Sequence, residues 1–307
     1  MCGRTGLSLD KNQVQCACSY KPKNATKFIK PPWIDEHNGG KEYTPSYNIA
    51  PTDVTPVIIS ASRFTEDNTN RIIKPMMWGI IPPWHKGDHR NHGLSTNNCR
   101  IENIKSSKLY GPALREGGRC VIVVEGFYEW QTTKPTKIKQ PYYIYAQQDL
   151  DVDNPETWNY DFDEDSGWRG IKLLSLAGIY SVWKNSDVTI YCYSVITMDS
   201  NSTMNWLHHR MPAILESQEQ VEAWLDIKNV NPEMALSYLR PVTILAWHPV
   251  STDVNNSKNK STSCNKRIKL ITKKTNQKAI TAWFTKAQKR KSDEGESDLK
   301  KIKKEGI

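Results

Sequence analysis

The fold prediction rests on one stretch, Arg119-Cys120-Val121-Ile122-Val123-Val124-Glu125-Gly126-Phe127-Tyr128-Glu129-Trp130. Its first half is an apolar run rich in β-branched residues, which is typical of a buried strand. The run leads directly to Glu129, a carboxylate between two large aromatic side chains. Burial there would raise the pKa of the Glu129 carboxyl and suit it to proton transfer. An exposed Glu in an amphipathic strand would produce the same pattern, so the residues alone leave both interpretations open.

Other strand-like runs lie before and after this stretch. They cover residues 55–60, 171–180, 188–196 and 242–246. A further apolar run contains Trp78, which is expected to pack in the core, and it ends at Pro82 and Pro83 because proline cannot continue a paired strand. Trp84 lies beyond the proline pair in a polar loop, where an exposed, stacking role is expected.

Few helices are expected. Capping signatures at Ser217 and Asn231 predict two short helices, and the polar cluster 97–102 is expected to begin a helical segment that reaches about Tyr110. Residues 5–40 are expected to be mostly loops. Since strands outnumber helices and do not alternate with them, the pattern predicts an α+β domain with mainly antiparallel β-structure.

The positive charge of the chain is concentrated at one end. The 307 residues carry a formal net charge of +9, but residues 258–307 hold 16 Lys and Arg against 5 Asp and Glu, a net of +11, which leaves −2 for residues 1–257. We therefore predict a catalytic globule over residues 2–257 and a basic, largely disordered tail over 258–307. Basic clusters at 289–291 and 300–304 resemble a nuclear import signal and predict a location in the nucleus.

Seven cysteines, an odd number, are scattered along the chain without a Cys-x-x-Cys pair. This spacing argues against a disulfide framework and a zinc site, and neither a metal nor a cofactor is predicted. No secretory signal opens the chain, and no apolar run approaches the ~18 residues of a membrane span. We expect a reduced, intracellular, soluble protein that acts as a monomer.

The sequence begins Met1-Cys2-Gly3-Arg4. Methionine aminopeptidases remove an initiator Met that precedes a small residue, so the mature chain is expected to begin at Cys2, with a free α-amine beside the thiol. Ordinary pKa values of ~7.7–8.0 for the amine and ~8.5 for the thiol make both groups usable near neutral pH. This 1,2-aminothiol could act as a nucleophile with its own base, or condense with an aldehyde to a five-membered thiazolidine. Alternatively, a cysteine near a frayed chain end could have no chemical role.

The densest polar cluster is His208-His209-Arg210-Met211-Pro212. Side chains at neighbouring positions cannot easily share one metal ion, so the cluster favours acid–base chemistry over zinc binding. A surface turn is the structural alternative.

Five separated motifs resemble, in this order along the chain, the SRAP (SOS-response-associated peptidase) family, which shields abasic sites in single-stranded DNA. They are Met1-Cys2-Gly3-Arg4, Asn98-x-Arg100-x-Glu102, Gly126-Phe127-Tyr128-Glu129-Trp130, Ile196-Thr197 and His208-x-Arg210-Met211-Pro212. The resemblance spans about residues 2–257. It implies two sheets or a barrel-like core with flanking helices, and a DNA damage function in which Cys2, after loss of Met1, traps the aldehyde of an abasic sugar as a thiazolidine crosslink.

The resemblance also implies residue roles. Glu129 would assist opening of the sugar ring and handle protons near the Cys2 amine. His208 would act as acid and base in forming and reversing the crosslink, and Asn98 would orient the reacting centre. The residues predicted to contact DNA are Arg4, Asn48, Trp84, Arg100, Thr197 and Arg210. Arginines would bind phosphates without sequence preference, and Trp84 would stack on or wedge against a base.

A second partner is predicted from the tail. The spacing of Gln277, Ile280, Trp283 and Phe284 places a Gln and three apolar side chains on one helical turn that could enter a groove. Residues 277–284 therefore resemble a sliding-clamp (PCNA) binding box, with Trp283 where Phe or Tyr is usual. An incidental helix in the tail is the alternative.

Three other functions remain open from the sequence. An N-terminal-nucleophile amidohydrolase would use Cys2 to attack an amide, and a peptidase, acting on its own leading residues or on other chains, would share this nucleophile. A reader of modified DNA without catalytic activity would use the polar clusters as a base pocket. Loss of Cys2 would spare binding by a reader and abolish the covalent chemistry of the others.

Overall fold

The computed structural model describes residues 2–36, 40–63, 71–133, 139–151, 158–186 and 188–270. One compact unit extends to Ile268, and residues 269–307 form a second unit. The predicted clamp-binding segment 277–284 and both basic clusters lie outside the described residues.

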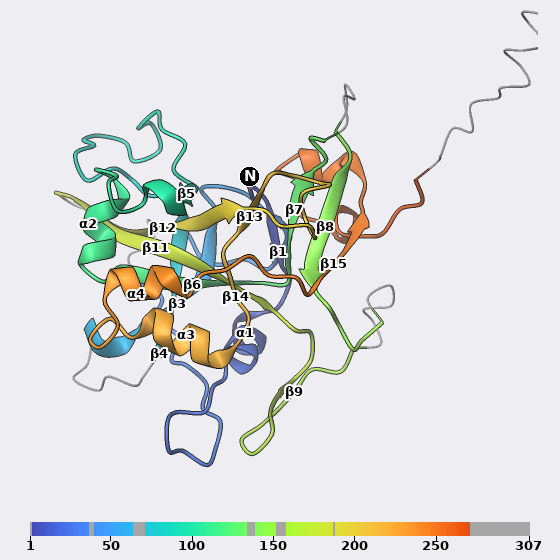
Figure 1. Cartoon of the computed structure of the whole chain (residues 1–307), viewed down its shortest axis with the longest axis horizontal. Helices are drawn as coiled ribbons and strands as arrows, with labels where there is room; N and C mark the ends of the chain where they lie inside the picture. The colour runs from blue at the N-terminus through green and yellow to red at the C-terminus, as the bar shows by residue number, and fades with distance from the viewer. Residues whose placement is uncertain are drawn as a thin grey trace, which may run out of the picture. The chain divides into compact units, whose positions relative to one another are not determined.

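A closed five-stranded barrel forms one half of the compact unit (Figure 1). Its strands pair in the ring order β12-β4-β3-β6-β11 and back to β12. Their bounds are β3 Val54–Ser60, β4 Arg71–Trp78, β6 Arg119–Val124, β11 Leu174–Asn185 and β12 Val188–Asp199. All neighbours are antiparallel except β12 and β4. The predicted α+β fold with a barrel-like core is therefore confirmed.

Both faces of several barrel strands are buried, because side chains fill the interior and other elements cover the outside. Every residue of β3, β4 and β6 is buried, which explains why these strands are continuous apolar runs instead of alternating ones. Helix α3 (Gln218–Leu225) covers β6, and its Trp224 indole donates a hydrogen bond to the Cys120 carbonyl at 2.9 Å. Trp78 is fully buried, as expected.

The second sheet has five strands in the order β15-β8-β7-β1-β2. Their bounds are β1 Thr5–Leu7, β2 Ser46–Ile49, β7 Gly126–Trp130, β8 Pro141–Ala146 and β15 Leu245–Pro249. The chain passes from barrel to sheet at Glu125, whose carboxylate accepts hydrogen bonds from the Ser8 amide and hydroxyl, both at 2.8 Å. A Cβ at Gly126 would lie 2.5 Å from the Tyr143 ring, so only glycine allows this close crossing.

The remaining elements are short. They are α1 Lys11–Ala17, β5 Asn98–Arg100, α2 Tyr110–Arg115, β9 Asp161–Asp163, β10 Gly167–Arg169, β13 Arg210–Pro212, β14 Ile214–Leu215 and α4 Pro232–Ser237. Single 3-10 turns occupy Ala61–Arg63, Ile101–Asn103, Thr252–Asn255 and Thr262–Cys264.

Two local predictions were wrong. Helix α1 forms within the region expected to be loops, because Asp10 and Gln13 make a reciprocal capping box at its start. The cluster 97–102 begins as strand β5, since Asn98–Arg100 pairs in parallel with β12 before the chain turns. Both elements place residues of the candidate site.

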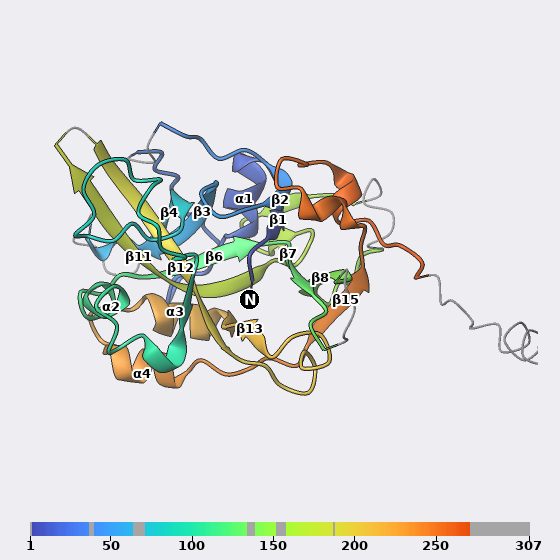
Figure 2. The same cartoon turned by 90° about the horizontal axis from the view of Figure 1, so that it is seen from above.

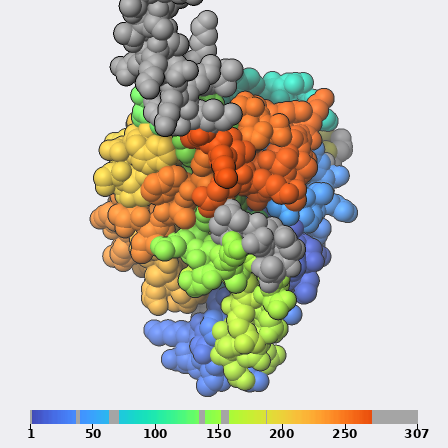
Figure 3. All heavy atoms as spheres, turned by 90° about the vertical axis from the view of Figure 1, so that its right-hand side faces the viewer, coloured from blue at the N-terminus to red at the C-terminus, as the bar shows by residue number. Residues whose placement is uncertain are grey.

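The compact unit continues beyond the boundary predicted at residue 257. The Lys260 ammonium group contacts the Asp53 carboxylate at 2.6 Å, Cys264 is fully buried, and Val250 forms a β-bridge with Arg267. Figure 3 shows this orange segment at the surface next to the green residues of β7 and β8. Polar Asn, Ser and Lys composition suggested a tail, but these side chains are used in backbone hydrogen bonds.

Among the described residues, no helix is long and apolar enough to cross a membrane.

Candidate active site

Strand pairing brings Cys2 to Glu129. In β1, Thr5 lies opposite Phe127, and the Arg4 carbonyl accepts a hydrogen bond from the Tyr128 amide at 2.9 Å. Because the strands are antiparallel, the residues before Arg4 run toward the end of β7 that carries Glu129. Cys2 is 1% exposed, and its thiol contacts the Arg4 carbonyl at 3.9 Å.

The backbone of Cys2 is fixed by two neighbouring amides. The Asn98 side-chain nitrogen donates to the Cys2 carbonyl at 2.7 Å, and that of Asn97 does so at 3.4 Å. Asn98 is itself held by the pairing of β5 with β12 and by the Tyr110 hydroxyl, which donates to its carbonyl at 3.1 Å. The Asn98 side-chain oxygen is buried without a hydrogen-bond partner in the described part of the chain, so it is an acceptor available to a ligand.

Glu129 and His208 form a buried pair. The His208 Nε2 atom lies 3.7 Å from the Glu129 carboxylate, and both side chains are almost fully buried. The Arg210 backbone amide donates to His208 Nδ1 at 3.0 Å. The Arg210 carbonyl lies 3.3 Å from the same nitrogen. When His208 accepts at Nδ1, its neutral ring carries the proton on Nε2 and directs a donor at Glu129.

Burial favours the uncharged form of each group at the site. It raises the pKa of the Cys2 thiol, and the nearby Glu129 carboxylate raises it further. Burial also raises the pKa of Glu129, in accord with the prediction from its flanking aromatics. For His208, burial and the charge of the nearby chain amino group lower the pKa to about 4, and His209 lowers it further. At neutral pH the site therefore holds a protonated thiol, a neutral imidazole and a carboxyl that takes up a proton readily.

This arrangement offers proton donors, proton acceptors and a thiol within one buried space. It is suited to addition and dehydration at a carbonyl group, in which protons must be moved and water released. Within the described residues, no group of three or more His, Cys, Asp and Glu side chains is placed to hold a metal ion.

The predicted DNA contacts separate into two groups. Trp84 is 56% exposed and Arg100 is exposed, so both can meet a ligand. Arg4 is half-buried, with its guanidinium donating to the Gly3 and Asn255 carbonyls at 3.1 and 3.4 Å. These three remain candidates for DNA contacts.

The other three predicted contacts have interior positions that favour structural roles instead. Asn48 is 0% exposed and donates to the carbonyls of residues 254, 256 and 259, at 3.2, 3.0 and 2.9 Å. Arg210 is buried, and its guanidinium contacts the carboxylates of Glu102 and Asp199, each at 2.6 Å. Thr197 is fully buried beneath this cluster, where its carbonyl accepts from Arg210 at 2.8 Å. Their charge or polarity is used within the fold.

Sequence reasoning missed Asn97 and Tyr110 as residues that position the site. Asn97 belongs to the polar cluster 97–102, but nothing in that sequence pattern shows that two adjacent amides reach the Cys2 carbonyl. A cavity of about 340 Å³ adjoins Asn97, and Trp78, His89 and Leu94 are among its lining residues. Its position beside a residue that holds Cys2 makes it part of the site's surroundings.

The chain is similar to known proteins over most of its length. Residues 1–257 match the model of the family described as SOS response associated peptidase (SRAP). The Xenopus tropicalis protein named abasic site processing protein HMCES is 40% identical over 279 residues, which cover 89% of this chain and 80% of that protein. The Gallus gallus protein of the same name is 35% identical over 317 residues, covering 100% of this chain and 91% of that one. Abasic site processing protein YoqW of Bacillus subtilis is 30% identical over 231 residues, covering 74% and 88%.

A solved structure has a similar fold. The crystal structure of a protein from Bacteroides thetaiotaomicron matches with a TM-score of 0.62 and 21% identity, and the match covers 87% of this chain and 100% of that one. At this level of identity the likeness concerns the fold alone.

Proposed function

The chain belongs to the SOS response associated peptidase (SRAP) family, and from this membership and the geometry at Cys2 we propose that it processes abasic sites in DNA by binding them covalently. The relatives named above carry this substrate in their names. The reacting group is the aminothiol of Cys2, which exists once Met1 has been removed.

The convergence of four separate segments at Cys2 carries the proposal. Asn98 from β5 holds the Cys2 carbonyl at 2.7 Å, Glu129 from β7 raises the pKa of its thiol, and His208 lies 3.7 Å from Glu129. A cysteine without a chemical role at a frayed end would not be held by a buried amide and faced by a buried acid–base pair.

The proposed reaction joins both Cys2 groups to one carbon. A ring-opened abasic sugar carries an aldehyde, and the Cys2 nitrogen adds to the aldehyde carbon. The adduct loses water to form an imine. The thiol sulfur then adds to the imine carbon, and the thiol proton ends on the nitrogen. One water is released, and neither an oxidant nor a reductant is needed.

The electrostatics of the site support this order of steps. Because burial raises the pKa of the Cys2 thiol, the sulfur is held protonated and is a weak nucleophile, so the amine attacks first. Because the pKa of Glu129 is raised, this carboxyl holds a proton more readily than an exposed Glu and can give it to the departing hydroxyl. The lowered pKa of His208 keeps the imidazole neutral beside Glu129, where its Nε2–H can orient that carboxyl. The same protonation also disfavours thiolate attack on an amide, the step that a hydrolase would need.

Contacts outside the reacting centre complete the proposal. Arg4 and Arg100 would bind phosphates, and the exposed Trp84 would stack at the lesion. The basic tail would add general attraction to DNA and direct the protein to the nucleus, and residues 277–284 would bind a sliding clamp. The composition of the tail is what supports these last assignments.

The test is a denaturing gel of the purified protein after incubation with single-stranded DNA that contains one abasic site. Mass spectrometry first confirms that Met1 is absent. We expect a slower band that survives denaturation with the wild-type protein and disappears with Cys2→Ala. DNA with a tetrahydrofuran analogue, which has no aldehyde, controls for trapping by binding alone.

Absence of the band with a wild-type protein that begins at Cys2 would refute covalent trapping. If Cys2→Ala also binds the DNA as well as wild type does, the protein would then be a reader of the lesion. Release of amines from amide substrates by wild type only would instead indicate a hydrolase.

A further inference from the structure

Aromatic side chains continue the face of the sheet that carries Glu129. Residues directly opposite each other in paired strands have side chains on the same face. Glu129 of β7 lies opposite Tyr142 of β8, and one pleat further along Ile144 lies opposite Trp247 of β15. Glu129, Tyr142 and Trp247 therefore share one face across three strands.

Trp206 covers this face from the loop that leads to His208. Its ring centroid lies 5.0 Å from that of Tyr142, edge-on at 86°, and 5.5 Å from that of Trp247, tilted at 44°. Tyr142 is buried, Trp206 is half-buried and Trp247 is 39% exposed. Tyr142 is thus the floor, and Trp206 with Trp247, here called the indole pair, forms the accessible surface.

The loop that carries Trp206 is held by hydrogen bonds of its indole nitrogen and of its backbone carbonyl. The Trp206 indole nitrogen donates to the Thr203 carbonyl at 2.8 Å. The Trp206 carbonyl accepts from the side chains of Gln131, at 3.4 Å, and Thr133. Gln131 and Thr133 follow directly after β7, so one strand positions both Glu129 and the indole pair. A surface fixed in this way loses little conformational freedom when it binds.

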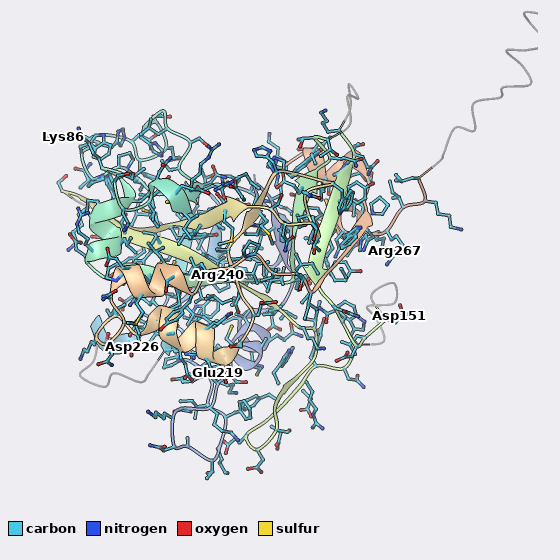
Figure 4. All side chains as sticks on the ribbon, in the orientation of Figure 1. Lys86, Asp151, Glu219, Asp226, Arg240 and Arg267 are labelled. Atoms are coloured by element: carbon cyan, nitrogen blue, oxygen red, sulfur yellow. The ribbon has the colours of Figure 1, made fainter. Side chains whose placement is uncertain are left out.

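Strand β15, which carries Trp247, lies to one side of the N-terminal strand. Figures 1 and 2 show β15 to the right of β1. Figure 4 labels Arg267, which forms a β-bridge with the residue after β15, on the same side. From the spacing of strands and the rise per residue, the backbone of Trp247 is about 12 Å from that of Glu129. A strand of DNA with its lesion at Cys2 reaches this far within a few nucleotides.

We infer that the indole pair stacks an unpaired base of the DNA strand that carries the abasic site, a few nucleotides from the lesion and on the side where β15 lies. This inference rests on the function proposed above and names a second contact surface for the same substrate. Indole faces stack on any base without reading its identity, which suits a protein that must act in any sequence. Since the lesion lacks a base, stacking of a neighbouring base supplies binding energy that the abasic sugar cannot.

The test combines protein variants with DNA from which single bases are missing. Full-length wild type and Trp247→Ala are titrated with fluorescent single strands whose central lesion is a tetrahydrofuran analogue, so that binding is reversible. In further strands, one base at each of three positions on either side is replaced by the same analogue. We expect Trp247→Ala to bind the parent strand about five- to tenfold more weakly. We expect no difference between the two proteins on the strand that lacks the stacked base.

Two further variants sharpen the comparison. Trp247→Phe keeps an aromatic face and should retain most of the affinity. Ile244→Ala removes an apolar side chain that is 65% exposed shortly before Trp247 but has no ring, and it should bind as wild type does. Thermal melting checks that each variant is folded.

Equal binding of wild type and folded Trp247→Ala to every strand would overturn the inference. A uniform loss on all strands, or an equal loss with Ile244→Ala, would also overturn it, because the surface would then not recognise a base. Failure of wild type to crosslink a true abasic strand would refute the proposed function instead, and it is measured in a separate experiment.

Discussion

Burial shifts the pKa values of Glu129 and His208 in opposite directions. Burial raises the pKa of the carboxyl and lowers that of the imidazole, so both groups are driven toward their neutral forms. A buried ion pair would need to recover a large desolvation cost for two charges. The pair is therefore suited to moving a proton. In a permanent salt bridge the proton would stay on the imidazole.

Replacing Glu129 by Gln should slow crosslinking about 100-fold while leaving affinity for the tetrahydrofuran analogue within about twofold of wild type. The wild-type rate should fall as the pH rises through the raised pKa of Glu129, since the acid then loses its proton. The variant should lack this dependence. Crosslinking rates between pH 5 and 9 measure both effects, and a variant as fast as wild type would remove Glu129 from the mechanism.

His208→Gln should change how stability depends on pH. The pKa of His208 is lowered from 6.5 to about 4 in the folded protein, so the unfolded chain binds a proton first as the pH falls. Stability present above pH 6.5 is thus lost progressively between about pH 6.5 and 4. A glutamine does not titrate, and the variant should lose about 2 kcal/mol less than wild type between pH 7 and 4.5. Urea unfolding at the two pH values checks this, and parallel losses would contradict it.

Single residues also show how far sequence reasoning reached. Burial of Glu129 was one of two interpretations that its sequence allowed, and the aromatics on either side favoured it because such a segment has little surface left for solvent. The partners of Arg210 could not be predicted from the sequence. An arginine in a polar motif reads the same whether it faces a phosphate or, as here, two carboxylates from Glu102 and Asp199. Glu102 lies in the 3-10 turn after β5 and Asp199 at the end of β12, and only the fold brings them together.

At the scale of elements, β7 connects most of the candidate site. It pairs with β1 to place Cys2, carries Glu129, and leads into the residues that anchor the loop of Trp206 and His208. The run Arg119–Trp130 predicted the strands because its composition is unusually apolar. Strand β5 could not be predicted, since so short a segment with two polar residues becomes a strand only when β12 lies beside it.

Asn48 tests the structural role of a residue first expected to bind DNA. Asn48→Ala would leave the carbonyls of residues 254, 256 and 259 without their donor, at a cost of about 2–3 kcal/mol. The melting temperature should fall clearly, while the folded variant should bind single-stranded DNA as wild type does. Asn229→Ala is the control: this side chain is exposed and donates only to the nearby Asp226 carboxylate, so the variant should melt close to wild type. Weaker DNA binding with unchanged melting would restore the original expectation.

For the whole molecule, the folded unit and the charged tail should separate cleanly at Ile268. Residues 258–268 supply Lys260 and the buried Cys264 to the fold, so a chain ending at Ile268 should melt like the full protein and one ending at Ser257 should melt at a lower temperature. Differential scanning calorimetry of the two truncations checks this. Equal melting of both would return the boundary to residue 257.

The same truncation should alter the salt dependence of DNA binding. Residues 269–307 carry 12 Lys and Arg against 5 Asp and Glu, and each phosphate contact made by the tail adds about −0.7 to the slope of log affinity against log salt for a single strand. The chain ending at Ile268 should show a shallower slope and similar affinity at high salt. An unchanged slope would mean that the tail does not touch DNA. Composition predicted the charge of this region well. It could not place the end of the folded unit, because polar residues that hold a loop by hydrogen bonds have the same composition as polar residues in solvent.

The burial of Cys2 fixes when its amine can be made. At 1% exposure, residue 2 of the finished fold is out of reach of a peptidase, so the proposed reaction requires removal of Met1 while the chain is still being translated. The ribosome adds roughly 5–20 residues per second, so His208 emerges tens of seconds after Cys2, and the nascent N-terminus stays open during that interval. Under this proposal, Met1 is removed during synthesis. Protein refolded with Met1 in place should therefore resist methionine aminopeptidase. Rapid trimming of that refolded protein, seen by mass spectrometry, would show that the N-terminus opens again after folding.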